Sequence, residues 1–270
     1  MMNRCRVNSD TPQLPQVLTA MPNLKQTIKL LIFVVTLLTI IFVVAWLRPL
    51  PELPRHQPRD LPWTLPDFSR AKTQIEVLND GRIHIQIEHL PLHNIEPKFI
   101  SYFYKVLPIS TVMINGQIIP MYHIFHPTEH GDIYVVEAAA SGEKGMATGA
   151  LIGRKEWFGT YNSEATGRIL EMNSTLMIAR PEMFGLHLGL ITHTFEKTEW
   201  GTRYTLESFI GSELPIIGPL INSYIRNKMF PPTMITEWIR HQVQEVSSLQ
   251  FFVRELYEQT PEDNQFILNI

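Results

Sequence analysis

An uninterrupted apolar run near the N-terminus limits what this chain can fold into more than any other feature. Residues 30–47 read LLIFVVTLLTIIFVVAWL, which contains no charge and only two polar residues, both threonines. At a helical rise of about 1.5 Å per residue the run reaches about 27 Å, close to the hydrocarbon thickness of a bilayer. A core helix of this length usually keeps a polar stripe. The run therefore predicts a transmembrane helix over residues 30–47.

The flanks of this run favour an anchor that is kept. Trp46 lies at one end, where an amphipathic ring suits the headgroup region, and Lys29 and Arg48 flank the run. A cleaved signal peptide would have a shorter apolar region followed by a small-x-small pair, whereas AWLRP stands here. Basic residues are balanced on the two sides of the run. Because a lone N-terminal anchor most often leaves its short tail in the cytoplasm, we expect a single-pass protein with an extracytoplasmic domain.

The rest of the chain predicts one domain behind a spacer. Residues 48–66 contain six prolines, which favour an extended, semi-rigid segment. The net charge of −3 gives no basic field for nucleic acid. The single cysteine, Cys5, excludes a thiolate nucleophile or a cysteine metal site from the domain. The predicted organisation is a polar tail (1–29), a transmembrane helix (30–47), a proline-rich linker (48–66) and one folded domain (67–270).

Strand-like and helix-like periodicities in the domain predict an α+β fold. GRIHIQIEHL alternates isoleucine with polar residues, as a half-buried strand does, and TEWG is a plausible hairpin turn with Gly201 at positive φ. A curved antiparallel sheet that grips a long C-terminal helix would leave a cavity between its concave face and the helix. The expected strands fall at 81–90, 147–160, 166–181 and 185–210, and the expected helices at 96–107 and about 233–259.

The C-terminal helix carries an unusual pair of side chains. WIRHQVQEV contains His241 and Glu245, four residues apart on a face that also includes Trp238, Ser248 and Phe252. We expect this face to point into the cavity. A histidine and a glutamate so spaced can share one metal ion. The alternative interpretation is a surface ion pair worth a few tenths of a kcal/mol.

A cluster of histidines supplies further ligand candidates. YHIFHPTEHG holds His123, His126 and His130, and RKEWFG places Glu156 on an expected strand. His123 and His126 cannot both face one side of a regular strand. A bulge or turn at Pro127 would re-aim His126, whereas His123 and His130 suit capping or pairing within a loop.

Five segments in order resemble the 2,4-diacetylphloroglucinol hydrolase family, which includes phloretin hydrolase. They are YHIFHPTEHG, GRKEWFG, LITHTFEKTEWGTRY, INSYIRNKMFPPTM and WIRHQVQEV, and the resemblance covers roughly residues 75–257. It implies a helix-grip (Bet v 1-like) domain that binds Zn²⁺ through two histidines and two glutamates. It also implies hydrolysis of the carbon–carbon bond between an acyl group and a phenolic ring.

Carried over by motif, the resemblance implies a complete metal site. The ligands would be His126 and Glu156 together with His241 and Glu245, with His126 preferred to His130 because its spacing to Glu156 suits the family pattern better. Such a ligand set also accepts iron or manganese, so zinc rests on the resemblance.

The resemblance implies catalytic side chains as well. His193 of THTFE would be a proton shuttle, and Tyr204 and Tyr122 would hydrogen-bond a phenol or carbonyl oxygen. Hydrolysis of an aryl ketone needs a polarised carbonyl, a nucleophilic water and a proton for the ring carbon, which this set supplies. The expected partners are a small acylphenol-like substrate and a lipid bilayer. The alternatives are a non-enzymatic carrier of hydrophobic or lipid-like ligands and a metal-dependent hydrolase of esters or amides.

Overall fold

The computed structural model describes residues 24–49, 52–183 and 185–268. The chain divides into two compact units, Met1–Arg48 and Pro49–Ile270, which are considered separately. Residues 1–23 of the predicted polar tail lie outside the described residues, as do residues 50–51 of the predicted linker.

The first unit contains one apolar helix. Helix α1 spans Leu24–Leu47 and so begins before the predicted start at residue 30. Over Leu24–Val44 its mean hydropathy is 2.8 and none of it is buried. Among the described residues it is the one helix that is long and apolar enough to cross a membrane, judged by length and composition.

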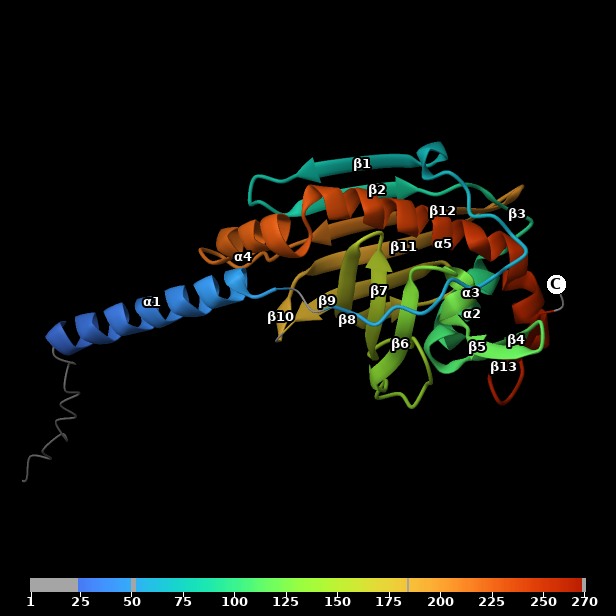
Figure 1. Ribbon diagram of the computed structural model, residues 1–270, viewed down its shortest axis with the longest axis horizontal. Coiled ribbons are helices and arrows are strands. Elements are labelled where there is room, and N and C mark those ends of the chain that lie inside the picture. The colour runs from blue at the N-terminus through green and yellow to red at the C-terminus, as the bar shows by residue number, and fades with distance from the viewer. Residues whose placement is uncertain (1–23, 50–51, 184, 269–270) are drawn as a thin grey trace, which may run out of the picture. The chain divides into compact units, whose positions relative to one another are not determined.

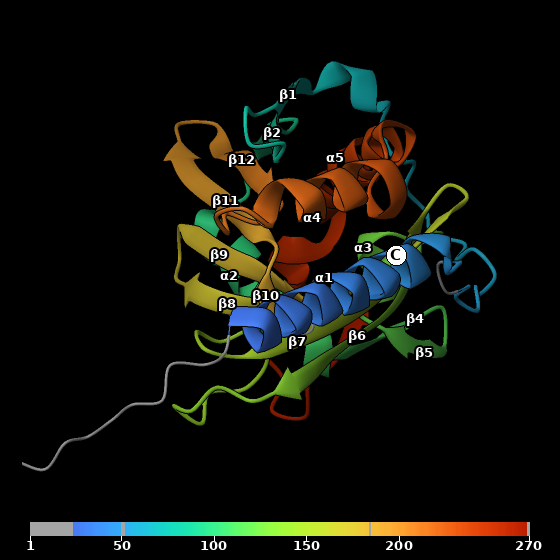
Figure 2. The ribbon, with the colours of Figure 1, turned by 90° about the vertical axis from the view of Figure 1, so that its left-hand side faces the viewer.

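The second unit is a large antiparallel sheet wrapped around one long helix (Figures 1 and 2). The main strands are β1 (Lys72–Val77), β2 (Ile83–Glu88), β6 (His130–Glu137), β7 (Leu151–Phe158), β8 (Tyr161–Met172), β9 (Leu176–Met183), β11 (Gly189–Thr198) and β12 (Gly201–Ile210). They are ordered β1-β2-β12-β11-β9-β8-β7-β6. Two short strands, β3 (Leu92–His93) and β10 (Leu186–His187), pair with β12 and β9. This is the predicted helix-grip fold.

Helix α5 (Pro232–Gln259) is the gripped element. Proline at its first position fits helix initiation, and Thr260 in the left-handed region ends it. The five residues of the predicted face are all buried: Trp238, His241, Glu245, Ser248 and Phe252. One apolar cluster reaches along the helix to Val243 and a second begins at Val246. His241 and Glu245 therefore lie where the two halves of the core meet.

Shorter elements close the ends of the sheet. They are the helices α2 (Pro97–Val106), α3 (Tyr122–Phe125) and α4 (Gly218–Tyr224), the 3₁₀ turns η1 (Phe68–Arg70) and η2 (Leu107–Ile109), and the π-helical turn η3 (Ile225–Met229). A small separate sheet has the order β13-β4-β5, with β4 at Thr111–Ile114, β5 at Gln117–Pro120 and β13 at Gln265–Leu268. In Figure 1, this small sheet and α4 lie at opposite ends of the large sheet.

The hairpin between β11 and β12 shows how one local prediction is fulfilled. Its strands pair through Thr198 and Gly201, and Gly201 has φ 143°, as the TEWG pattern predicts. A Cβ atom at Gly201 would lie 2.1 Å from the carbonyl oxygen of Leu92. Only glycine lets β12 approach β3 this closely.

The proline-rich linker differs from its prediction as a spacer. From residue 52 it runs along the domain, and the Arg55 guanidinium donates to the carbonyl of Gly159 at 2.7 Å. The ring of His56 packs on that of His123, with centroids 4.1 Å apart. Proline keeps the segment extended, but its arginine, histidine and tryptophan side chains find partners on the domain. We call residues 52–66 the strap.

Candidate metal centre

Three elements bring the centre together. Helix α3 and the turn after it lead into β6, whose first residue, His130, pairs directly with Glu156 of β7. Directly opposed residues of neighbouring strands point to the same face of a sheet. That face is covered by α5, which presents His241 and Glu245 one turn apart. All four side chains are buried.

Four ligand-type side chains converge at this point. The Nε2 atom of His130 lies 3.1 Å from Nε2 of His241 and 3.0 Å from Oε2 of Glu245. The Nε2 atom of His241 lies 3.5 Å from Oε2 of Glu245 and 3.8 Å from Oε2 of Glu156. Ligand atoms around a tetrahedral Zn²⁺ lie about 3.3 Å apart, given bonds of about 2.0–2.1 Å. The four groups therefore have the separations of a metal ligand set.

The Nδ1 atoms of His130 and His241 point away from the centre and are already hydrogen-bonded. Nδ1 of His130 donates to the carbonyl of Tyr122 at 2.7 Å, because a carbonyl can only accept. Nδ1 of His241 donates to Oε2 of Glu129 at 3.0 Å. Metal-binding histidines commonly use one nitrogen in this way, which fixes the ring and frees the other for the metal. The two Nε2 atoms thus face each other beside the Glu245 carboxylate, where they can share a proton or a cation.

Electrostatics favour positive charge between these rings. Burial disfavours a charged His241, yet hydrogen bonds to Glu129 and Glu245 prevail and raise its pKa to about 9. Burial likewise opposes ionisation of Glu129, but its hydrogen bond with His241 lowers its pKa to about 2. Among the described residues, Oε1 of Glu156 is buried without a hydrogen bond, although Nη1 of Arg154 lies 3.0 Å away. The residues present therefore fit a bound cation.

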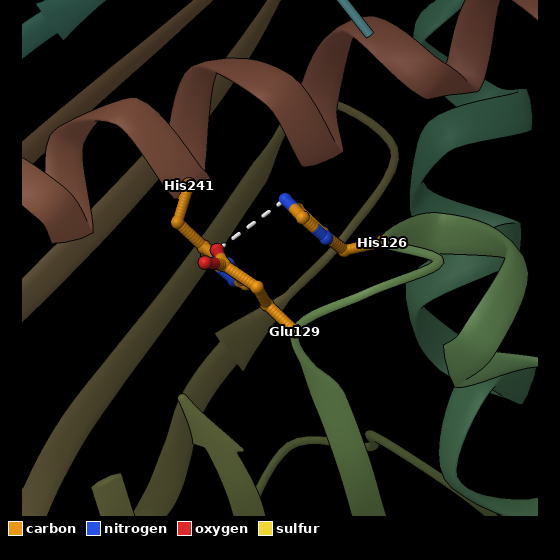
Figure 3. A group of neighbouring side chains, drawn as sticks. All are labelled: His126, Glu129 and His241. Atoms are coloured by element: carbon orange, nitrogen blue, oxygen red, sulfur yellow. Dashed lines mark hydrogen bonds and ion pairs between the residues drawn. The ribbon is translucent and has the colours of Figure 1, made fainter. Parts of the chain in front are cut away.

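His126 lies beside His241 and Glu129 (Figure 3), and its ring centroid is 5.6 Å from that of His130. Its ring stacks on that of His241 with centroids 4.5 Å apart, and its Nε2 atom is 3.5 Å from Oε2 of Glu129. The structure thus brings Glu156, His241 and Glu245 together as predicted, but the imidazole that meets them is that of His130. The physical reason is that α3 is helical, so β6 begins only at His130.

His126, Glu129 and His241 also lie close enough to hold a cation. Glu129 is already neutralised, because the Arg240 guanidinium donates to its Oε1 atom at 2.5 Å. The backbone N–H of Gly159 donates to the same atom at 2.8 Å. Because the other oxygen of Glu129 accepts from Nδ1 of His241, we assign Glu129 the role of holding that ring in place.

The predicted catalytic residues lie beside the centre. Nδ1 of His193, on β11, is 2.8 Å from the hydroxyl of Tyr204, on β12. That hydroxyl is 2.6 Å from the hydroxyl of Tyr104, on α2. Burial lowers the pKa of His193 to about 4, so the ring is neutral near pH 7. The hydroxyl of Tyr122 donates to Oε2 of Glu156 at 2.7 Å, which orients a carboxylate of the centre rather than facing a substrate alone.

A cavity joins the centre to this hydrogen-bonded chain. It measures about 120 Å³ as the space open to the centre of a water molecule. One water needs only about 10–15 Å³ on this measure, so a small organic molecule fits. Most of its wall is apolar, and its polar lining includes Tyr104, Tyr122, Arg154, His193 and Glu245.

Sequence reasoning missed three members of the site. Glu129 was not considered, although it stands directly before His130 in YHIFHPTEHG. Tyr104 falls in the helix expected at 96–107, and that expectation assigns no role to its hydroxyl. Arg154 lies two residues before Glu156 on β7, and period-two alternation places both on one face of the strand. That alternation was the available signal for Arg154.

Fold and site together define a helix-grip domain whose cavity ends at a buried group of histidines and carboxylates. No protein-family model matches the chain, and no curated protein was found to match it. Among solved structures, Ara h 8.0201 is similar, with 10% identity, a TM-score of 0.42, and coverage of 65% of this chain and 99% of that one. Protein Ms6760 from Mycobacterium smegmatis has 11% identity and a TM-score of 0.39, and the match covers 64% of this chain and 94% of that one. The KanY protein (ms6282) has 10% identity and a TM-score of 0.38, and the match covers 71% of this chain and 99% of that one.

Proposed function

We propose that this chain is a membrane-anchored, metal-dependent hydrolase. It cleaves the carbon–carbon bond between an acyl group and a phenolic ring. The observation that carries the metal is the pair of Nε2 atoms of His130 and His241, 3.1 Å apart with both Nδ1 atoms already donating. The substrate class comes from the resemblance of five ordered segments to the diacetylphloroglucinol hydrolases.

Four side chains would hold the cation: His130, His241, Glu245 and Glu156. A divalent cation bound there would polarise a carbonyl oxygen and would lower the pKa of a water toward about 7. The chain's own contribution is to exclude solvent, because these four residues are at most 6% exposed. Glu129 and the carbonyl of Tyr122 hold the two rings in orientation.

Proton delivery is the second requirement of the reaction. Water adds its oxygen to the acyl carbon, the aryl–acyl bond breaks with its electron pair going to the ring carbon, and that carbon takes a proton. A neutral His193, hydrogen-bonded to Tyr204 and through it to Tyr104, can accept and pass on such a proton. The tyrosine hydroxyls suit the phenolic oxygens of the substrate.

The test begins with the metal content of the full-length chain in detergent. We expect about one divalent cation per chain, lost in His130→Ala and kept in His84→Gln, which changes a histidine paired with Glu207 on the sheet surface. We also expect acylphenols to release a carboxylic acid and a phenol, and chelation to stop this release. A wild-type chain without stoichiometric metal contradicts the proposal.

The largely apolar cavity wall supports a second candidate, a carrier of hydrophobic ligands. A carrier keeps its ligand after chelation and releases no acid. The third candidate is an ester or amide hydrolase. Comparing the rates of hydrolysis of a set of esters and a set of aryl ketones tests it, because only that enzyme would hydrolyse the esters faster.

A further inference from the structure

An apolar surface is displayed at the α4 end of the domain. Of the large apolar side chains in the described residues, that of Ile216 is the most exposed, at 90%. Its neighbours Leu214, Ile217 and Leu220 are exposed as well. The segment 213–220 reads ELPIIGPL and has one charged residue, Glu213. We call Leu214, Ile216, Ile217 and Leu220 the apolar tip.

The fold holds this tip in place. The buried side chain of Asn222 accepts from the backbone N–H of Ser212 at 2.6 Å and donates to the carbonyl of Asp80 at 2.9 Å. The N–H of Gly218 donates to the carbonyl of Leu214 at 2.9 Å and closes the turn. The apolar side chains therefore extend outward from a fixed backbone.

Backbone strain gives a second, independent sign. Ile216 has φ 67°, in the left-handed region that a β-branched residue rarely adopts. Strain of this kind persists where the surrounding structure imposes it, and it clusters at functional positions. Ile216 therefore combines an unfavourable backbone conformation with almost no burial of its side chain in its own domain.

Covalent geometry limits how far this domain can lie from a bilayer. Arg48 ends the unit that contains α1, and the Arg55 side chain is bonded to Gly159 of the domain. Seven Cα–Cα steps reach at most about 25 Å. Gly159 lies against Glu237 near the start of α5, which follows α4 and η3 directly along the chain. Figure 2 shows α4 leading into α5 at this end of the sheet.

We propose that the apolar tip inserts into the lipid bilayer in which α1 is anchored. An exposed apolar patch without a protein partner marks an interaction surface, and a bilayer interface accepts isoleucine and leucine. Lys228 follows the tip in η3 and suits a phosphate headgroup. This inference rests on the membrane-anchoring part of the proposed function and is independent of the hydrolase part.

The segment that precedes the tip is hydrogen-bonded to a strand of the cavity wall. The N–H of Leu188, just after β10, donates to the carbonyl of Pro181, and the N–H of Gly211 donates to the carbonyl of Leu188. Pro181 lines the cavity. Backbone hydrogen bonds therefore connect the cavity wall to the segment that precedes the tip.

The test uses single cysteines in full-length protein, after Cys5→Ser removes the only native one. Ile216→Cys and Leu220→Cys probe the tip. Ile118→Cys, an isoleucine 59% exposed on β5 at the opposite end, is the matched control. Thr39→Cys reports insertion of α1. Each carries an environment-sensitive fluorophore in phosphatidylcholine vesicles with doxyl-labelled acyl chains.

We expect quenching at 216 and 220 that is several-fold stronger than at 118. Quenching at 216 and 220 no greater than at 118 overturns the proposal, whatever position 39 shows. Lack of quenching at 39 contradicts the anchor and, with it, this proposal, whereas quenching at 39 without quenching at 216 and 220 overturns this proposal alone. Disulfide-linked dimers through position 216, without lipid quenching, assign the tip to a second copy of the chain and also overturn the proposal.

A release assay gives an independent measurement. A protease site placed within residues 49–54 is cut in the vesicle-bound protein. The wild-type domain should stay on the vesicles after cleavage. The fraction of domain released should be at least about tenfold larger for the double variant Ile216→Glu/Leu220→Glu. Equal release of both contradicts insertion of the tip.

Discussion

The Nε2 atoms of His130 and His241 face each other at 3.1 Å, while the Nδ1 proton of each ring is already donated elsewhere. Two lone pairs this close repel unless positive charge lies between them. Either a proton on His241 or a metal cation supplies that charge, and the neighbouring carboxylates of Glu245 and Glu156 stabilise both.

His130 and His126, whose rings both contact that of His241, should differ in their effect on metal binding. His130→Ala removes a ligand, so we expect the stoichiometric metal to be lost. His126→Ala leaves the four ligands in place and weakens only the support of Glu129, so affinity should fall about 10- to 100-fold at most. Chelator competition measures both. Loss of metal in His126→Ala with retention in His130→Ala would reverse the assignment.

Glu129 should act through His241. We expect Glu129→Gln to lower metal affinity about 10- to 100-fold, because a neutral amide replaces the negative carboxylate that orients the His241 ring. Glu237→Gln is the matched control, since Glu237 also binds the Arg240 guanidinium, at 2.9 Å, but does not reach His241. Equal effects of the two substitutions would mean that Arg240, not His241, mediates the change.

Metal should stabilise the folded domain. A cation that binds only the folded state at 100 times its Kd adds about 2.7 kcal/mol to the free energy of unfolding. We expect Zn²⁺ to raise the Tm of chelator-treated wild type and to leave that of His130→Ala unchanged. A Tm increase of the same size in both proteins would place the stabilising cation elsewhere.

His193 should affect turnover without affecting metal content. We expect His193→Gln to lower kcat about 10²- to 10⁴-fold, because proton transfer to the ring carbon loses its carrier. His187→Gln, at an exposed position of β10, is the control. If metal content falls together with kcat, His193 supports the centre instead of moving a proton.

His89 should make stability depend on pH. Burial lowers its pKa to about 3, and among the described residues neither ring nitrogen has a hydrogen bond. The folded pKa lies below the unfolded value of about 6.5, so the unfolded chain binds a proton first as the pH falls. Stability from this group is therefore complete above pH 6.5 and decreases toward pH 3.

The size of this effect can be measured directly. At pH 5 the loss is about 2 kcal/mol, at about 1.4 kcal/mol per pH unit below 6.5. Urea unfolding of wild type and His89→Leu at pH 7.5 and pH 5, both with chelator, should show a smaller decrease in the variant by about this amount. Parallel decreases would mean that His89 is hydrated in the folded state.

Local patterns account for most of what the sequence predicts correctly. The face of α5 follows from 3–4 spacing, and the hairpin at Gly201 follows from turn chemistry; neither depends on distant residues. The choice between His126 and His130 depends on where β6 begins and how it pairs with β7. Strand register is a tertiary property, so the spacing along YHIFHPTEHG could not reveal which ring meets Glu156.

The linker shows the same limit. Its prolines correctly indicate an extended backbone, but they carry no information about where that backbone lies. The contacts of Arg55 with Gly159 and of His56 with His123 depend on segments more than 60 residues further along the chain. A spacer and a packed segment therefore look alike in the sequence.

The packed strap changes where a fragment for crystallisation should begin. The Arg59 guanidinium donates to Nδ1 of His123, and the Arg59 N–H donates to the carbonyl of Pro127. A protein trimmed to residues 67–270 would expose the outer side of the turn that carries His130. A fragment that begins at residue 52 keeps that turn covered. A fragment that begins later is expected to bind metal less well because the turn before His130 has lost its cover, even though all four proposed ligands are present.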